Sequence, residues 1–580
     1  MAGVTDGVLF LIPARGGSQR VPGKNLRTVA GIPLVGRAAR TARLAADRLE
    51  GGPHRVVCST DDAAIAAAAR AWGAETPFER PASLATADAT SVDVALHALE
   101  ALAAGGSRFR ALVLVQPTSP LTDPADLVTA VERFDAGDGC GVVSVAGAHP
   151  AAWHQVLGPD DAISAVVADD AEAILTGAFY VVDPIALASS RRFVEAGVTI
   201  GQRVPPDRSV DVDEEDDLVI ADALAAARPV RAFAIADRTI GEGPVFVIAE
   251  AGVNHNGDPG LAHRLVDAAA ATGADAVKFQ TFDPTALAAP GAPRASYQET
   301  TGDDGDDQRA MLARLALPAD VWAGLRDHAQ DRGLVFLSTP FDDRSAELLD
   351  GLGVPAFKVG SGELTNLPFL ARLARRGRPL LVSTGMAEMV EVAAAVDAVV
   401  AAGDPPLALF HCVSSYPARP EDANLRAIVT LRNAFGVPTG WSDHTPGTEL
   451  ALASAAVGAG LIEKHLTLDR GMPGPDQRTS LEPTEFARMV AGIRAVTDAI
   501  GSGDKVPVEA EREIAAVARR SLHWTRDLPL GAMVTDEDLA SLRPGTGLPP
   551  GRGIEVVGRT TARAVAAGAM VAKMDIDGLL

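Results

Sequence analysis

From Pro244 to about Gly501 the chain alternates short apolar, strand-like segments with helix-like segments and leaves little sequence between them. Eight such strand–helix units in roughly 250 residues have the size and order of a (β/α)8 barrel. The sequence therefore predicts this fold for residues 231–505. The expected strands start near Phe246, Ala276, Val335, Ala356, Leu380, Ala408, Thr439 and Leu461.

Reactive side chains recur where these expected strands end. In a (β/α)8 barrel the carboxyl ends of the strands form the rim that carries the chemistry. Structural polar residues scattered along the chain would have no reason to gather there. The side chains expected at this rim are Glu250, Lys278, Thr339, Lys358, Ser361, Glu363, Ser383, Thr384, Ser414, Tyr416, Ser442, His444 and His465.

These side-chain types predict a class of chemistry. Two lysines among several hydroxyls suit a ligand with a phosphate and a carboxylate, and Glu250 and Glu363 could serve as acid and base. His444 and His465 could hold one divalent metal, although either histidine taken alone is more often a hydrogen-bonded core residue. The residues alone indicate carbon–carbon bond formation or metal-assisted hydrolysis of a phosphorylated acid.

The first region, to about residue 228, is predicted to be an open α/β sheet with ligands beyond the carboxyl ends of its strands. Its first strand, Val8–Ile12, leads into a glycine-rich turn that carries Arg15, Arg20 and Lys24, which suits a polyphosphate. Asp211 and Asp213 would point the same way on an extended segment and could share a divalent metal, or they could be the acidic start of a helix. The other expected strands lie at 55–59, 111–115, 141–145 and 178–182.

Composition limits the remaining function classes. The net charge of −23 argues against general binding of nucleic acid or anionic membranes. Cys58, Cys140 and Cys412 form neither a disulfide framework nor a zinc spacing, which fits a reducing cytoplasm. No signal peptide is recognised, and no segment approaches the ~20 apolar residues that span a bilayer. Residues 515–580 are expected to form a small third domain, and Thr300–Asp307 a solvated loop or an active-site lid.

The motifs of the barrel region resemble those of the sialic acid synthases, which condense phosphoenolpyruvate with an N-acyl hexose. The resemblance is carried, in order along the chain, by Ala249–Gly257, Val277–Gln280, Ser338–Asp342, Lys358–Glu363, Ser383–Met386, Trp441–Thr445 and Glu463–His465. The last region resembles the antifreeze-like (SAF) domain of this family, through Ser541–Gly545. The resemblance implies a homodimer or higher oligomer in which this domain covers the partner's barrel and Arg543 reaches the sugar.

The same resemblance implies roles for single residues. His444 and His465 would bind Mn²⁺ or Mg²⁺, and Glu250 would be the main acid/base, with Glu363, Tyr416 and Asp476 around the sugar. Two positions depart from the family: Ser414 stands where asparagine is frequent, and Gln477 stands where histidine is frequent. Both lie on the sugar side, so they bear on which sugar is used. Phosphoenolpyruvate would be held by Lys278, Thr339, Lys358, Ser361, Ser383 and Ser442, with Ser414 also on the substrate side.

The first region, 6–228, resembles the CMP-sialic acid synthetases through Pro13–Asn25, Arg80–Pro81, Gln116–Leu121, Thr176–Tyr180 and Asp211–Asp213. Thr176 stands where the family has asparagine, and no arginine occurs between Trp153 and Thr176, where the family has a pair. The resemblance implies that Arg15, Gly16, Gly17, Lys24 and Asn25 hold the CTP phosphates, Ser91 the cytidine, Gln116 the sugar, and Asp211 with Asp213 a Mg²⁺ ion.

We therefore expect a bifunctional cytoplasmic enzyme whose barrel makes a nonulosonic acid and whose first region activates it as a CMP-sugar. Two alternatives stay open. In one, the synthase is active and the first region is a non-catalytic sugar- or nucleotide-binding module. In the other, the barrel is a metal-dependent hydrolase that needs no enolpyruvate.

Overall fold

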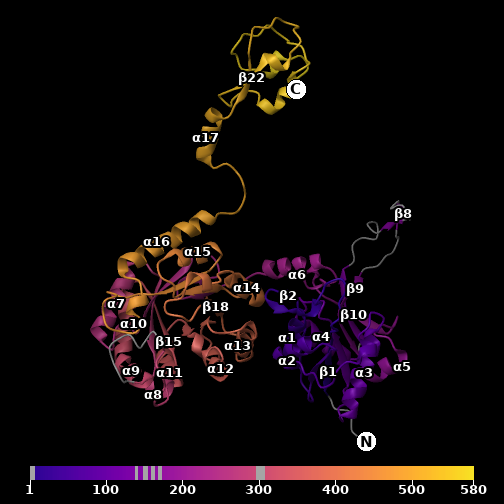
Figure 1. Cartoon of the computed structure of the whole chain (residues 1–580), viewed down its shortest axis with the longest axis vertical. Helices are drawn as coiled ribbons and strands as arrows, with labels where there is room; N and C mark the ends of the chain where they lie inside the picture. Colours follow the sequence, from indigo (N-terminus) through magenta and orange to yellow (C-terminus); the bar gives the residue numbers. More distant parts are fainter. Residues whose placement is uncertain are drawn as a thin grey trace. The chain divides into compact units, whose positions relative to one another are not determined.

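A computed structural model of the chain describes residues 7–137, 141–147, 155–157, 163–166, 173–295 and 307–579 (Figure 1). Cys140 and almost all of the expected loop at 300–307 lie outside these residues. The chain divides into two compact units, the first ending at Ala499 and the second running from Ile500 to Leu580. Among the described helices, none combines the length and apolar character needed to cross a bilayer.

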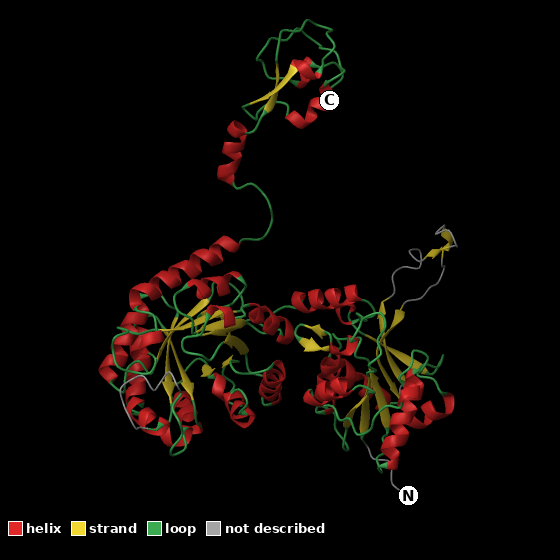
Figure 2. Cartoon of the chain, viewed as in Figure 1, coloured by secondary structure: helices red, strands yellow, loops and turns green. Residues whose placement is uncertain are grey.

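The amino-terminal part of the first unit is an α/β domain in which helices flank a sheet (Figure 2). The sheet has six strands in the order β10-β6-β9-β5-β1-β4. The strands are β1 (Val8–Pro13), β4 (Arg55–Ser59), β5 (Ala111–Val115), β6 (Gly141–Gly147), β9 (Ala173–Val182) and β10 (Thr199–Arg203). All five strands expected from the sequence are present, and β10 adds a sixth. Strand β9 runs antiparallel to both β5 and β6, so the sheet is mixed.

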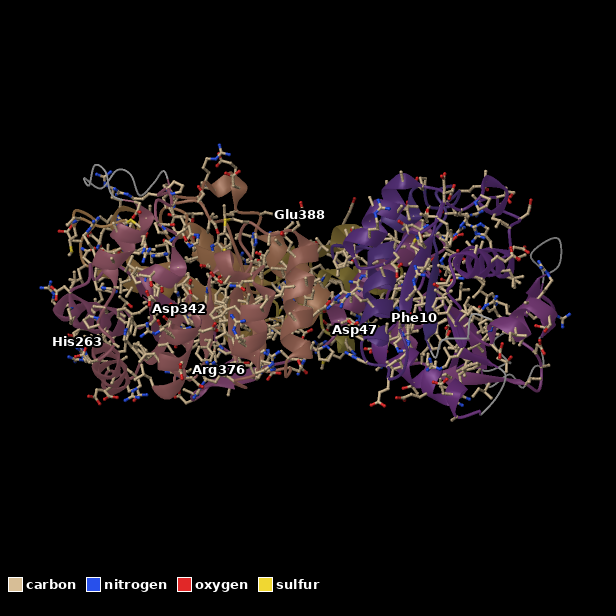
Figure 3. All side chains as sticks on the ribbon, turned by 90° about the horizontal axis from the view of Figure 1, so that it is seen from below. Phe10, Asp47, His263, Asp342, Arg376 and Glu388 are labelled. Carbon is tan, nitrogen blue, oxygen red and sulfur yellow. The ribbon has the colours of Figure 1, made fainter. Side chains whose placement is uncertain are left out.

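Helices cover both faces of this sheet, as its apolar strands require. Every residue of β5 is buried, and Phe10 of β1 lies inside the domain (Figure 3). The helices are α1 (Leu34–Ala46), α2 (Ala63–Ala71), α3 (Ser91–Ala104), α4 (Pro124–Asp135), α5 (Pro184–Ser190) and α6 (Glu215–Ala227). Two short hairpins, β2 (Thr28–Val29) with β3 (Ile32–Pro33) and β7 (Gln155–Leu157) with β8 (Ile163–Val166), stand apart from the sheet.

The middle of the chain is the predicted barrel. Its eight strands pair in the order β15-β14-β13-β20-β19-β18-β17-β16, and every pairing recorded is parallel. No ladder joins β15 to β16, so the barrel is nearly closed. The strands are β13 (Phe246–Gly252), β14 (Ala276–Thr281), β15 (Val335–Pro340), β16 (Phe357–Val359), β17 (Leu380–Ser383), β18 (Leu407–Cys412), β19 (Thr439–Asp443) and β20 (Leu461–His465).

Helices surround the barrel, and their starts can be read from the sequence. An aspartate followed by proline opens α7 and α8 here, as it opens α4 and α5 in the first domain. Each aspartate accepts a backbone N–H of the first turn, a cap worth about 1 kcal/mol, and proline fits the first helical position. The helices are α7 (Pro259–Ala271), α8 (Pro284–Leu287), α9 (Gln308–Leu315), α10 (Val321–Asp331), α11 (Asp343–Gly351), α12 (Leu367–Ala374), α13 (Met389–Ala401), α14 (Arg426–Phe435), α15 (Glu449–Ala456) and α16 (Pro483–Ile500).

A hairpin of β11 (Phe233–Ile235) and β12 (Arg238–Ile240) precedes the barrel. Ile235 and Ile240 are fully buried and pack with Phe246, Ala276 and Leu461, each of which is at or near the start of its strand. The hairpin therefore seals the amino end of the barrel, which leaves the carboxyl end for a polar site.

The first domain contacts the barrel within the first unit. Arg40 of α1 donates to Asp397 of α13 at 2.6 Å, and Arg43 of α1 bonds to the same carboxylate. Asp397 is 8% exposed, so this pair is largely shielded from water. Helix α13 starts immediately after Glu388, at the barrel surface in Figure 3.

The second unit is small and has its own core around Trp524, Val534 and Val556. Strands β21 (Ser521–Trp524) and β22 (Leu539–Leu542) pair antiparallel. Helix α17 (Glu509–Ala518) precedes them and α18 (Gly553–Val556) follows. This agrees with the expected small domain of short strands and turns.

Candidate active sites

A cavity of about 590 Å³ opens where the barrel strands end. Most of the site residues predicted from the sequence line it, although they come from the eight barrel strands or the segments that follow them. The predicted residues in its wall are Glu250, Lys278, Thr339, Lys358, Ser361, Ser383, Ser414, Tyr416, Ser442, His444, His465 and Asp476.

Strand register brings the reactive groups to one level of the barrel. Glu250 of β13 lies directly opposite Lys278 of β14 on one side and His465 of β20 on the other. The Lys278 ammonium is 2.7 Å from Glu250 Oε2, and the Gln280 amide donates to Glu250 Oε1 at 3.0 Å. Glu250 is therefore held on both carboxylate oxygens.

Each lysine in the cavity is paired with a hydroxyl from the next strand. Lys278 Nζ donates to Thr339 Oγ1 at 3.1 Å, and Lys358 Nζ donates to Ser383 Oγ at 2.6 Å. Both lysines are almost fully buried. Both ammonium groups belong to the cavity wall, where they could bind an anionic ligand.

The carboxyl groups of the cavity differ in their tendency to ionise. Burial raises the pKa of Glu250, and Glu463 adds to the rise while Lys278 opposes it. Burial also raises the pKa of Asp476, to about 6. Burial acts against ionisation of Glu463 too, yet Lys278 and Lys358 together hold its pKa below the usual range. Carboxyl groups whose pKa values are driven apart in this way suit an acid and a base within one site.

The two histidines could hold a divalent ion. His444 Nδ1 donates to the Val413 carbonyl at 2.8 Å, which leaves Nε2 as an electron-pair donor. Within the described residues His465 Nδ1 has no hydrogen-bond partner, and Asp476 Oδ2 is 3.9 Å away. Burial lowers the pKa of both histidines, so each is the neutral imidazole that a metal requires. The described residues contain no group of three His, Cys, Asp or Glu ligands, so water or substrate would complete the coordination.

Two residues expected at the sugar side lie elsewhere. Glu363 does not line the cavity, and its Oε2 accepts from Asn366 Nδ2 at 2.8 Å. Gln477 is fully buried and donates to the Asn254 carbonyl at 3.0 Å, so it stabilises the segment that follows β13.

Arg543 is exposed on the second unit, immediately after β22.

Sequence reasoning missed four polar residues of the cavity wall: Gln280, Gln308, Cys412 and Glu463. Gln280 and Glu463 lie within recognised motifs, but nothing in the motifs says that their side chains point inward. Alternation along a strand gives the signal, since residues two apart share a face. Glu463 shares the inward face with His465, and Gln280 shares it with Lys278.

The predicted phosphate-binding turn of the first domain is held by contacts to distant segments. Lys24 Nζ donates to the Val212 carbonyl at 2.8 Å and to Asp213 Oδ1 at 3.2 Å. Asn25 Nδ2 donates to the Arg15 carbonyl at 2.9 Å. The turn and the aspartate segment are thus neighbours, as binding of a nucleotide with its metal ion would need.

The other residues expected in this site lie around the same edge of the sheet. Gly16 N–H donates to Asp61 Oδ1 at 2.9 Å, and the space around Gly17 is open. Ser91 is the first residue of α3, and Gln116 directly follows β5. Asp211 belongs to the segment that Lys24 contacts, two residues before Asp213.

At the position of the family's asparagine, Thr176 Oγ1 donates to Ser144 Oγ at 2.7 Å. The side chains of the stretch without arginines, from Trp153 to Glu172, lie outside the described residues.

Three family models match successive parts of the chain. Residues 265–505 match the family model described as the NeuB family, residues 9–174 the cytidylyltransferase model and residues 519–577 the SAF domain model. The chain is 43% identical over 327 residues to the N,N'-diacetyllegionaminic acid synthase of Legionella pneumophila, covering 56% of this chain and 92% of that protein.

Two further relatives are more distant. The chain is 34% identical over 328 residues to the N-acetylneuraminate-9-phosphate synthase of Homo sapiens, covering 55% of this chain and 89% of that protein. It is 30% identical over 334 residues to the pseudaminic acid synthase of Helicobacter pylori, covering 58% of this chain and 98% of that protein.

Proposed function

Because the chain belongs to the NeuB family, with a cytidylyltransferase domain before that region and a SAF domain after it, we propose a two-step activity. The barrel condenses phosphoenolpyruvate with an N-acyl hexose to a nine-carbon keto acid and releases phosphate. The first domain then joins CMP from CTP to that acid and releases pyrophosphate. The observation that carries the proposal is the buried cavity lined by two lysines, several hydroxyls and carboxyl groups whose pKa values are shifted in opposite directions.

Phosphoenolpyruvate has two anionic groups, and the cavity offers two buried cations. Lys278 with Thr339, and Lys358 with Ser383, each present an ammonium and a hydroxyl to one part of the cavity. Ser361 and Ser442, also in the wall, supply further donors. Fixing the enolpyruvate at both ends would direct its C3 carbon at the sugar aldehyde, which is the main gain from such positioning.

Glu250 is the residue best placed to move protons in this reaction. Its raised pKa keeps a proton available near neutral pH, and Lys278 and Gln280 fix the carboxyl group. After C3 attacks the aldehyde, a proton must reach the new alkoxide and water must add at C2 before phosphate leaves. Glu250 would supply or accept these protons, with Asp476 and Tyr416 on the sugar side.

A divalent ion on His444 and His465, Mn²⁺ or Mg²⁺, would polarise the sugar aldehyde. The neutral, buried imidazoles fit that task.

In the first domain, Arg15, Lys24 and the backbone of the glycine-rich turn would hold the CTP phosphates. Asp211 and Asp213 would hold Mg²⁺, and Ser91 and Gln116 would contact cytidine and sugar. The Lys24–Asp213 contact supports the proposal, because it brings the turn beside the expected metal ligands. Charge stabilisation at the α-phosphate is the largest requirement of such a transfer.

The SAF domain would act across subunits of a homodimer or higher oligomer. Arg543, exposed on the second unit, would reach the sugar in the partner's barrel. The cavity of one barrel would then be complete only in the assembly.

The test is to incubate the purified chain with phosphoenolpyruvate, CTP, Mg²⁺ or Mn²⁺ and a panel of N-acyl hexoses, and to identify products by mass. A nine-carbon keto acid and its CMP derivative are expected from at least one sugar. Keto acid without any CMP derivative or pyrophosphate would support a non-catalytic first domain. Hydrolysis of phosphoenolpyruvate without condensation would support the hydrolase instead.

A further inference from the structure

Glu463 is a buried carboxylate that the proposed reaction does not yet use. It lies on β20, two residues before His465, with its side chain in the cavity wall. We propose that Glu463 is a positioning residue, which holds the Lys278 and Lys358 ammonium groups apart and aimed at the two anionic groups of the substrate. This inference rests on the function proposed for the barrel.

The distances place this carboxylate between the two cations. Glu463 Oε2 is 3.7 Å from Lys278 Nζ, and Glu463 Oε1 is 3.7 Å from Lys358 Nζ. Oε1 also accepts a hydrogen bond from Ser442 Oγ at 3.1 Å, while Oε2 has no hydrogen-bond partner within the described residues. The carboxylate is thus fixed by a hydroxyl and bonded tightly to neither lysine.

The two lysines depend on Glu463 unequally. Lys278 has a second and closer carboxyl partner, Glu250, at 2.7 Å. Of the carboxylates in the described part of the chain, only Glu463 lies within 4 Å of Lys358. A buried ammonium without a counter-ion is unfavourable, and two buried ammonium groups repel each other. Before substrate binds, Glu463 therefore compensates part of the charge of both cations, and the anionic groups of phosphoenolpyruvate would take over that role in the complex.

Glu463 differs from a purely structural ion pair next to it. Lys464 of β20 and Asp443 of β19 are 2.7 Å apart and do not line the cavity. That short ion pair therefore makes no contact with a ligand in the cavity. Glu463, by contrast, keeps longer distances to two cations whose shorter partners are the hydroxyls of Thr339 and Ser383 and the carboxylate of Glu250.

A positioning role makes a specific prediction for kinetics. Glu463 is an anion in a site for an anion, so removing its charge should not weaken the binding of phosphoenolpyruvate. The lysines, however, would lose the fixed geometry that matters when charge shifts in the transition state. Turnover should fall while the KM for phosphoenolpyruvate stays the same or falls.

The test compares Glu463→Gln and Glu463→Asp with the wild-type chain. Glutamine keeps the shape and the acceptor for Ser442, and aspartate keeps the charge on a shorter side chain. Asp275→Asn is the matched control, because Asp275 pairs with Arg494 and lies outside the cavity wall. Melting temperature, kcat and KM are measured for all, and phosphoenolpyruvate binding is measured by calorimetry without sugar.

For Glu463→Gln we expect kcat to fall roughly tenfold or more, with phosphoenolpyruvate bound at least as tightly as by wild type. Glu463→Asp should recover part of the lost turnover. The control should lose stability and keep both kinetic constants. If Glu463→Gln does not fold, Glu463→Asp decides alone, with lower kcat and no rise in KM expected.

Three results would overturn the inference: wild-type kinetics for Glu463→Gln, a raised KM with unchanged kcat, or an aspartate variant no faster than the glutamine variant. Failure of the proposed function looks different. The wild-type chain itself would then release no phosphate with any sugar, and the calorimetry would still show whether Glu463 controls the binding of phosphoenolpyruvate.

Discussion

The barrel site and the first-domain site both gather cations and carboxylates, but the barrel site removes them from water more completely. The side chains of Lys278 and Glu250 are 3% and 2% exposed. Those of Arg20 and Asp213, 3.5 Å apart in the first domain, are 66% and 54% exposed. Buried charges interact strongly and fix one another, whereas an exposed pair contributes little. The barrel site is therefore organised before substrate arrives, whereas the first-domain site would gain order on binding the proposed nucleotide and metal ion.

This contrast leads us to expect the largest effects from changes to the barrel histidines. His465→Ala and His444→Ala should each abolish keto-acid formation and metal binding, because each removes one of the two proposed protein ligands. Metal content of the purified variants and phosphate release are the measurements. CMP transfer to a supplied nonulosonic acid should be unchanged, and a loss of that activity too would mean that the two sites are not independent.

Glu250→Gln should reduce condensation by roughly 10²-fold or more, the usual range for an acid/base group, without loss of the fold. Circular dichroism and phosphoenolpyruvate binding check that the variant is intact, and phosphate release gives the rate. Full phosphate release would remove Glu250 from the role assigned to it.

Mixing two inactive variants tests whether the second unit completes the barrel of a partner. Glu250→Gln and Arg543→Ala should each be weak alone, and mixing them under subunit exchange should restore part of the activity. The reason is that one of the hybrid sites carries both intact groups. Each variant mixed with itself is the control, and no gain on mixing would restrict Arg543 to its own subunit or to no role.

The smallest effect expected is a pH dependence of stability that comes from the barrel alone. Burial raises the pKa of Glu250 from 4.5 to about 7, so the folded chain keeps a proton that the unfolded chain releases. Stability relative to Glu250→Gln should therefore fall as the pH rises from about 4.5 to 7 and then level off, by about 3 kcal/mol at most. Denaturant unfolding of both proteins across this range measures it. A flat difference would show that Glu250 is already ionised when folded.

The sequence was sufficient for the barrel because its strands are continuous apolar runs buried on both faces, such as Phe246–Ile248 and Leu380–Val382. Strand β10 and the β11–β12 hairpin were missed. The sequence Thr199–Arg203 is half polar, and three-residue strands carry almost no periodic signal. Strand β10 forms because it pairs with β6, a tertiary contact that the local sequence does not show.

For the site, position on a strand predicted which residues face the cavity but not how they pair. Lys278 was expected to bind substrate, yet its short contact to Glu250 follows from the β13–β14 register, which no local pattern shows. Glu363 illustrates the opposite case. It follows a strand end as expected, but the turn Ser361–Glu363 directs it to Asn366 instead of into the cavity.

We propose that one chain carries two separate active sites that act in succession. The most direct test follows phosphate and pyrophosphate together in one reaction with phosphoenolpyruvate, an accepted N-acyl hexose and CTP, for the wild-type chain and for Asp211→Ala. We expect both products from the wild type, and phosphate at the wild-type rate without pyrophosphate from Asp211→Ala. Pyrophosphate released by Asp211→Ala at the wild-type rate, or no phosphate from the wild-type chain with any sugar, would refute the proposal of two sites.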